Sequence, residues 1–280
     1  MESVDYRDKT GDVEALKELA YLCGLILGDG TVCGSDYGIL IRSTKLELID
    51  IFCENTRKLG FRPYVLKYEE KAHKCPSGKI VDRTVYYARI RSKAMYAILR
   101  PCKLRDYKFK IPSFVFRNRK AAASFLQGYF DAEGSASFNK AKGFVEITAG
   151  SKHLSNIEEI KYCLGLLKIR AVVSRKKRCY VLSIADWPSR LKFKCLINFR
   201  IRRKCETLKR DREPKRRYYS EEVYQKTFEL RKVGMSYGKI SKLLGVPTSN
   251  LHRWVTRKVT PWGVKNIRDR DEKTSINNRR

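Results

Sequence analysis

The chain has 280 residues, and its 61 lysines and arginines outnumber its 30 aspartates and glutamates, which gives a formal net charge of +31. This surplus excludes an acidic surface and favours a polyanionic partner such as nucleic acid, bound in a strongly salt-dependent way. Because there is no long apolar run and the N-terminus is polar, we expect no membrane span, no membrane partner and no secretory signal. We expect an intracellular protein of the cytoplasm, nucleoid or an organelle, and its nine cysteines, without C-x-x-C spacing, favour free thiols.

Two segments of the chain repeat each other. Leu22–Gly30 and Leu126–Gly134 are both apolar runs of helical character that end on an acid followed by glycine. The acids, Asp29 and Glu133, occupy the same place in each copy. The chain is therefore predicted to be a duplicated unit that presents one carboxylate per copy.

Each copy has small residues four positions apart, Gly24 and Gly28 in the first and Gly128 and Ala132 in the second. Such pairs share one helix face, and a glycine inside a helix costs about 0.5–1 kcal/mol relative to alanine, so close packing against the other copy is expected. An acid at a helix C-terminus opposes the macrodipole by up to about 1 kcal/mol. The paired acids therefore favour a divalent-cation site, the alternative being two buried helices with ordinary end turns.

The two segments resemble the signature helices of the LAGLIDADG homing endonucleases in their single-chain, two-repeat form. Lys110–Phe116 and Ala123–Leu126 also resemble the run that precedes the second helix in that family. The resemblance covers roughly residues 12–200. It implies a monomeric, metal-dependent endonuclease that hydrolyses phosphodiester bonds in both strands of a long, asymmetric DNA site, with intron homing as its biological setting.

The resemblance also implies the site residues. Asp29 and Glu133 would bind Mg²⁺ or another divalent cation and act in catalysis, with Gly28 and Ala132 beside them in the metal site. Lys93 fits the basic residue that family members often place near a scissile phosphate. By the same alignment the second half has no equivalent lysine, a departure from the family pattern that would make cleavage of the two strands unequal.

The hydrophobic patterns predict an α+β fold with two pseudo-symmetric αββαββα halves, residues 12–104 and 105–200, joined by the paired helices. In the first half we expect helices at 13–27, 46–59 and 93–99 and strands at 39–43, 62–68 and 84–91. In the second we expect helices at 118–132, 153–167 and 189–199 and strands at 135–138, 144–148, 171–174 and 179–184.

Strands of this length can lie in the DNA major groove, where all four base pairs are distinguishable. The candidates for a DNA-reading face are Arg42, Arg89 and Arg91 in the first half and Glu146, Thr148 and Arg175 in the second. The alternative is a solvated face that contacts phosphates only.

The composition changes after Phe199. Residues 201–218 are rich in lysine and arginine and are predicted to be an exposed basic linker. Residues 219–262 predict a small all-α helix-turn-helix domain, and Gly234–Val246 resembles such modules in transposases and recombinases. Thr248, Ser249, Asn250 and Arg253 would then face DNA. The alternative is a three-helix domain with no DNA role.

Two further functions stay open at this stage. An RNA maturase that binds intron RNA and assists splicing would use the same positive charge. A non-cleaving, sequence-specific DNA-binding regulator would also fit, but such a protein would gain stability by losing Asp29 and Glu133. The intact acids therefore favour double-strand DNA cleavage.

Overall fold

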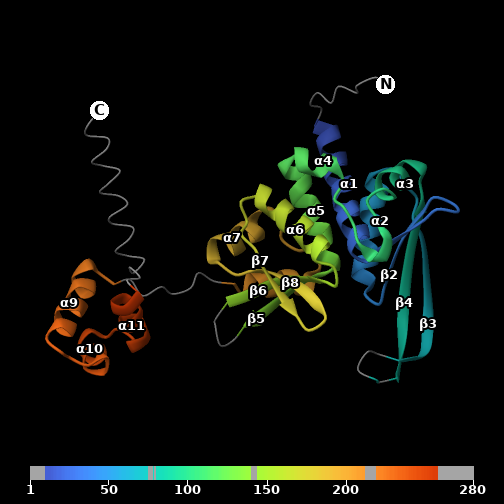
Figure 1. Cartoon of the computed structure of the whole chain (residues 1–280). Helices are drawn as coiled ribbons and strands as arrows, with labels where there is room; N and C mark the ends of the chain where they lie inside the picture. The colour runs from blue at the N-terminus through green and yellow to red at the C-terminus, as the bar shows by residue number, and fades with distance from the viewer. Residues whose placement is uncertain (1–9, 75–77, 79, 140–143, 212–218, 258–280) are drawn as a thin grey trace, which may run out of the picture. The chain divides into compact units, whose positions relative to one another are not determined.

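The computed structural model describes residues 10–74, 78, 80–139, 144–211 and 219–257. The chain divides into two compact units, Met1–Pro214 and Lys215–Arg280. The first unit contains two four-stranded antiparallel sheets with their helices (Figure 1), which confirms the predicted α+β class. None of the helices in the described ranges combines the length and apolar character needed to cross a bilayer.

The first half opens with the long helix α1 (Thr10–Asp29) and forms one sheet with the strand order β1-β2-β4-β3. Its other elements are β1 (Gly30–Cys33), β2 (Gly38–Ser43), α2 (Leu46–Lys58), β3 (Tyr64–Lys74), β4 (Ile80–Arg91) and α3 (Lys93–Leu99). The residue ranges predicted from sequence did not include β1, which has only four residues. β3 and β4 extend further than predicted and form a long hairpin (Figure 1).

The second half repeats this arrangement, with the strand order β5-β6-β8-β7. Its elements are α4 (Ser113–Arg117), α5 (Arg119–Ala132), β5 (Gly134–Asn139), β6 (Phe144–Ser151), α6 (Leu154–Leu166), β7 (Val172–Lys176), β8 (Cys179–Ile184) and α7 (Trp187–Leu196). A short 3₁₀ turn, Arg105–Tyr107, lies in the connection between the halves. The equivalent order of the two sheets confirms the duplication. The hairpins differ, because β7 and β8 have 5 and 6 residues where β3 and β4 have 11 and 12.

Helices α1 and α5 pack side by side between the two sheets (Figure 1). A Cβ atom on Gly24 would lie 2.0 Å from the carbonyl oxygen of Phe125, and one on Gly128 would lie 2.1 Å from that of Tyr21. Neither position can carry a side chain unless the helices separate. The two glycines therefore allow backbone-to-backbone contact, as their spacing predicted.

The predicted exposed linker is wrong over residues 201–211. Arg202–Lys209 form helix α8, in which Lys204 and Leu208 are buried. The buried carboxylate of Asp211 accepts a hydrogen bond from the backbone of Val145 at 2.8 Å and pairs with buried Arg190 at 2.9 Å. A run of positive charge usually indicates a solvated segment, but here several of its polar groups have partners inside the first unit. Residues 212–218 of the predicted linker lie outside the described ranges.

The second unit contains the three predicted helices, α9 (Glu221–Lys232), α10 (Tyr237–Leu244) and α11 (Thr248–Arg257). They enclose a small core of Tyr224, Ile240, Val246, Leu251 and Trp254. Gly245 ends α10 with φ +64°, a left-handed conformation that glycine adopts without steric cost. Its helix-turn-helix function stays a prediction, and residues 258–262 of the predicted domain lie outside the described ranges.

The helix contact gives a first prediction. Gly24→Ala should destabilise the first unit by about 3 kcal/mol, because the added methyl group overlaps the backbone of the opposing helix. Gly165→Ala in α6 is the matched control, since its Cβ would meet no atom within 4 Å and the change should add up to about 1 kcal/mol of stability. Urea denaturation followed by circular dichroism compares the two. Equal stability of both variants would contradict the packing.

Candidate metal and DNA-binding site

The ends of α1 and α5 bring the two predicted acids together. Asp29 is the last residue of α1, and Glu133 caps α5. A Cβ atom on Gly28 would lie 2.7 Å from the Cβ of Ala132 and 3.3 Å from the Cγ of Glu133, so the helix ends touch. The carboxyl groups of Asp29 and Glu133 are within hydrogen-bonding reach of each other. Gly28 and Ala132, which were also predicted to lie at this site, form the contact between the two helix ends beside the acids.

The proximity of the acids changes the titration of Glu133. Burial of its carboxyl group, the charge of Asp29 and a hydrogen bond with Asp29 together raise the pKa of Glu133 to about 7. The pKa of the nearby Tyr129 hydroxyl is also raised, mainly by burial and further by Glu133 and Asp29. Two adjacent carboxylates are hard to ionise together unless a cation or proton lies between them.

The acid pair suits a hard divalent cation. Mg²⁺ binds oxygen ligands, usually one or two carboxylates, and keeps several water molecules. No group of three or more histidine, cysteine or acidic side chains suited to a metal occurs in the described ranges. The protein would therefore supply the two carboxylates, and water and phosphate oxygens would supply the rest.

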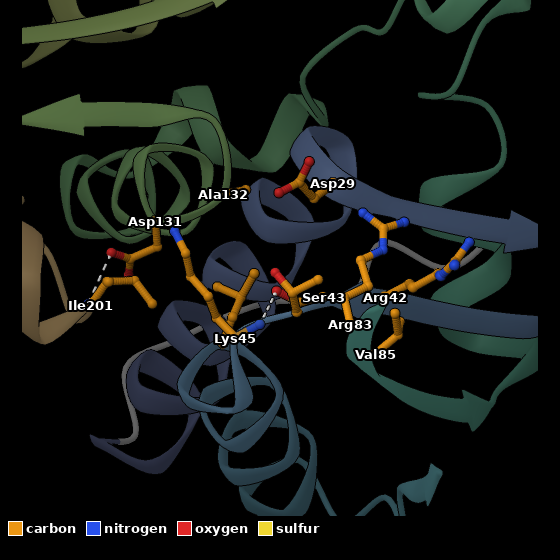
Figure 2. Close-up of a pocket in the computed structure, with 11 residues that line it drawn as sticks. Asp29, Arg42, Ser43, Lys45, Arg83, Val85, Asp131, Ala132 and Ile201 are labelled. Atoms are coloured by element: carbon orange, nitrogen blue, oxygen red, sulfur yellow. Dashed lines mark hydrogen bonds between the residues drawn. The ribbon is translucent and has the colours of Figure 1, made fainter. Parts of the chain in front are cut away.

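A pocket of about 370 Å³ lies beside Asp29, and we call it the Asp29 pocket. Its polar lining comes from the end of β2, the short segment before α2, and β4 (Figure 2), and includes Arg42, Ser43, Lys45 and Arg83. Its far wall is formed by Asp131, Ala132 and Ile201. Three cationic side chains therefore surround the space next to one carboxylate.

A second pocket of about 330 Å³, the Glu133 pocket, lies on the other side of the acid pair. It is lined by the corresponding segment of the second half, including Ser151, Lys152 and His153, and by Tyr107. The two pockets follow the duplication of the fold, but the second carries fewer permanent positive charges. The surroundings of the two acids are therefore unequal.

Two lysines that were not predicted lie at the helix ends. Lys204 is 5% exposed, and its ammonium group donates hydrogen bonds to the carbonyl oxygens of Phe130 at 2.9 Å and Asp131 at 2.7 Å. Burial lowers its pKa to about 8, although Asp131 opposes that shift. Lys103 donates to the carbonyl of Gly30, and burial lowers its pKa while Asp29 opposes the shift. Each lysine thus places positive charge where a helix end and an acid carry negative charge.

Comparison with known proteins agrees with this arrangement. A family model described as a LAGLIDADG-like domain matches residues 120–227. The solved structure of the homing endonuclease I-WcaI bound to its DNA recognition sequence is similar at a TM-score of 0.53 and 15% identity, over 69% of this chain and 86% of that chain. The first unit has the two-repeat LAGLIDADG fold. Full-length DUF199/WhiA from Thermatoga maritima shares the fold at a TM-score of 0.51 and 13% identity, over 90% of this chain and 96% of that chain.

Similar sequences are found in proteins of different kinds. An uncharacterized protein of Methanocaldococcus jannaschii is 31% identical over 134 residues, which span 46% of this chain and 45% of that relative. The ribonucleoside-diphosphate reductase NrdEB subunit alpha of Bacillus subtilis is 23% identical over 168 residues, 58% of this chain but only 15% of that protein. This chain thus matches less than half the length of each of these two relatives.

Lys93 does not join the acids of the LAGLIDADG domain. It is exposed at the start of α3, and its ammonium group lies 5.4 Å from the ring centroid of Tyr37. It lines neither of the two pockets. The alignment to the family suggested a position near a scissile phosphate, but the amines next to the helix ends are those of Lys103 and Lys204. In the sequence, Lys103 and Lys204 stand in the basic runs that follow the last helix of each half, and these runs were the signal from which the two lysines could have been found.

The three arginines predicted to read DNA in the first half lie on one face of its sheet, and their role there stays a prediction. Strand alternation and the pairing of Arg42 with Tyr87 place Arg42, Arg89 and Arg91 on one face, opposite the buried Ile41, Ala88 and Ile90. In the second half, Glu146 and Thr148 share a face of β6.

Arg175 does not belong to that face. It pairs with Tyr180 and lies on the side of Val173 and Leu182, which pack toward the core. The prediction that Arg175 shares the reading face is therefore wrong. Alternation in the sequence did not fix the register of the short strand β7.

In the second unit, Thr248, Ser249 and Arg253 are exposed on α11. Asn250 is half-buried, and its side-chain amide reaches the hydroxyl of Tyr219 at 3.5 Å. Three of the four residues predicted to face DNA are therefore accessible on one helix, and Asn250 also holds the helix to the segment before α9.

The raised pKa of Glu133 gives a prediction for the LAGLIDADG domain. Between its ordinary pKa of 4.5 and the folded value of about 7, the folded state keeps a proton that the unfolded state has released. The stability of the wild type relative to Glu133→Gln should therefore fall as the pH rises through this window and level off above it. Chemical denaturation at closely spaced pH values measures the difference. Asp29→Asn should reduce the fall, and a difference independent of pH would contradict the coupling.

Proposed function

We propose that this protein is a site-specific, metal-dependent endonuclease that hydrolyses both strands of a long, asymmetric DNA site. The observation that carries the proposal is the contact of Asp29 with Glu133 at the touching ends of α1 and α5. The net charge of +31 supports DNA as the partner. Both acids come from one chain, so a monomer would suffice.

Asp29 and Glu133 would hold Mg²⁺ or another divalent cation. When bound, such an ion activates water for attack on phosphorus and neutralises charge on the phosphate and the leaving oxygen. The raised pKa of Glu133 fits this role, because a cation can replace the proton that otherwise relieves repulsion between the two acids.

Positive groups around the acids would position the DNA backbone. Lys45 lines the Asp29 pocket, where a phosphate group could approach the acid. Lys204 holds carbonyl groups at the end of α5, Lys103 holds the carbonyl that directly follows α1, and both offset the negative charge there. The Glu133 pocket offers Lys152 and His153 instead, so each DNA strand would meet different side chains.

The decisive test is cleavage of a pooled library of long DNA duplexes, which should include the DNA flanking this reading frame, in the presence of Mg²⁺. The wild type should produce discrete double-strand breaks with short 3′ overhangs. Asp29→Asn/Glu133→Gln should bind the same duplexes with cleavage reduced at least about a thousandfold, because the metal loses both protein ligands.

Asp50→Asn/Glu158→Gln is the matched control. It makes the same charge change at exposed positions of α2 and α6 and should cut like the wild type. If the wild type and the Asp29/Glu133 variant both bind duplex without cutting under any divalent metal, the endonuclease proposal fails and a DNA-binding regulator takes its place. Binding of folded intron RNA in preference to duplex would identify a maturase.

The second unit would add DNA affinity through α11. Arg253→Ala should weaken duplex binding by roughly tenfold, because an exposed arginine on a recognition helix contacts bases or phosphates. Lys226→Ala, which removes an exposed charge from α9, is the control and should have little effect. Fluorescence anisotropy over a range of salt concentrations measures both. If both variants weaken duplex binding equally, binding depends on net charge alone and not on a contact made by Arg253.

A further inference from the structure

The arginines on the exposed face of the first sheet are held by two carboxylates. Asp36, in the turn between β1 and β2, pairs with Arg89 and, through Oδ2 at 3.0 Å, with the Nε of Arg91. Glu70, on β3, pairs with Arg42 and Arg83. Its Oε2 accepts from the Nε of Arg83 at 2.7 Å. These four arginines share one face of the sheet.

The local packing fixes these guanidinium groups further. A Cβ atom on Gly38 would lie 2.5–2.9 Å from three guanidinium atoms of Arg89, so this group lies directly over the glycine backbone. In the described part of the chain, Asp36 Oδ1 and Arg89 Nε are buried without a hydrogen-bond partner. The guanidinium of Arg42 lies 5.6 Å from the ring centroid of Tyr68. Arg89 is therefore held by a carboxylate on one side and the sheet on another.

Such pairing favours base recognition over simple phosphate binding. An arginine held by a carboxylate loses less side-chain entropy when its remaining N–H groups donate to O6 and N7 of guanine. The same carboxylate repels phosphate, so the pair binds the DNA backbone less well than a free arginine does. The arrangement therefore separates the two roles that the sequence left open for this face.

The corresponding face of the second sheet is different. Its described strand positions carry mostly small or neutral side chains, among them Ser135, Ser137, Thr148 and Ser183. Glu146 on this face accepts a hydrogen bond from Asn139 at 2.9 Å. No arginine occupies a described strand position on this face. The two halves therefore present unequal surfaces to a duplex.

We infer that Asp36 and Glu70 are specificity-determining residues, which orient Arg89 with Arg91 and Arg42 with Arg83 toward guanine edges in the DNA major groove. The inference rests on the proposed function in that it takes duplex DNA as the partner. It does not require cleavage. The first half then carries most of the base discrimination.

The test is selection of preferred sites from a random duplex library by the full-length protein in EDTA, where metal-dependent cleavage does not remove the bound DNA. Asp36→Asn and Glu70→Gln should each reduce discrimination at one or a few base pairs by about tenfold, as expected for one bidentate arginine–guanine contact. The two variants should affect different base pairs, because they release different arginines.

Two further variants separate orientation from charge. Gly38→Ala displaces the Arg89 guanidinium without changing the net charge and should lose the same base preference as Asp36→Asn. Glu69→Gln makes the same charge change as Glu70→Gln on the opposite face of β3. It should raise affinity for random duplex as Glu70→Gln does, but keep every base preference.

The outcomes are distinct. If the wild type selects a site and Asp36→Asn, Glu70→Gln and Gly38→Ala all keep its base preferences, the inference is overturned while sequence-specific binding stands. If the wild type selects no sequence, both the inference and the site-specific part of the proposed function fail. Thermal unfolding of each variant identifies any loss of folded protein before selection.

Discussion

The first unit depends on direct contact between the backbones of α1 and α5. Gly24 faces the carbonyl oxygen of Phe125, and Gly128 faces that of Tyr21. Each helix therefore has a glycine against which a backbone carbonyl of the other helix packs. This reciprocal contact relates the two halves by an approximate twofold axis. Because both helices end at the same level, their terminal acids meet. The geometry of the candidate metal site is thus a consequence of helix packing.

The meeting point of the helices is reinforced by polar groups of the second half. The buried carboxylate of Asp131 accepts a 2.7 Å hydrogen bond from the hydroxyl of Tyr21 and further bonds from the backbone N–H groups of Arg200 and Ile201. Burial raises the pKa of Asp131, although each of these bonds opposes that shift. Lys204 adds its bonds from α8. The chain therefore locks α5 onto α1 and onto the segment after α7 at once.

Local pattern was enough to predict the duplication, the helix contact and the pairing of Asp29 with Glu133, because each depends on residues a few positions apart in two similar segments. Prediction from local pattern failed where contacts between residues distant in sequence determine the structure. Lys204 stands in a basic run that resembles a solvated linker, yet its ammonium group is buried against carbonyl groups contributed by α5. Asp36, the partner of Arg89, and Glu70, the partner of Arg42, lie far from these arginines in sequence. Only the sheet register brings each pair together. The register of β7 was likewise not evident from the sequence, and Arg175 was therefore assigned to the wrong face of the second sheet.

The unequal hairpins bear on the fate of the two DNA ends after a double-strand break. The first half carries strands of 11 and 12 residues together with the paired arginines, whereas the second carries strands of 5 and 6 residues. After the proposed cut, one broken end would keep the larger contact area and the other the smaller. The two ends would then dissociate in a fixed order. The protein would remain attached to one side of the break and shield that end while the other became accessible to repair.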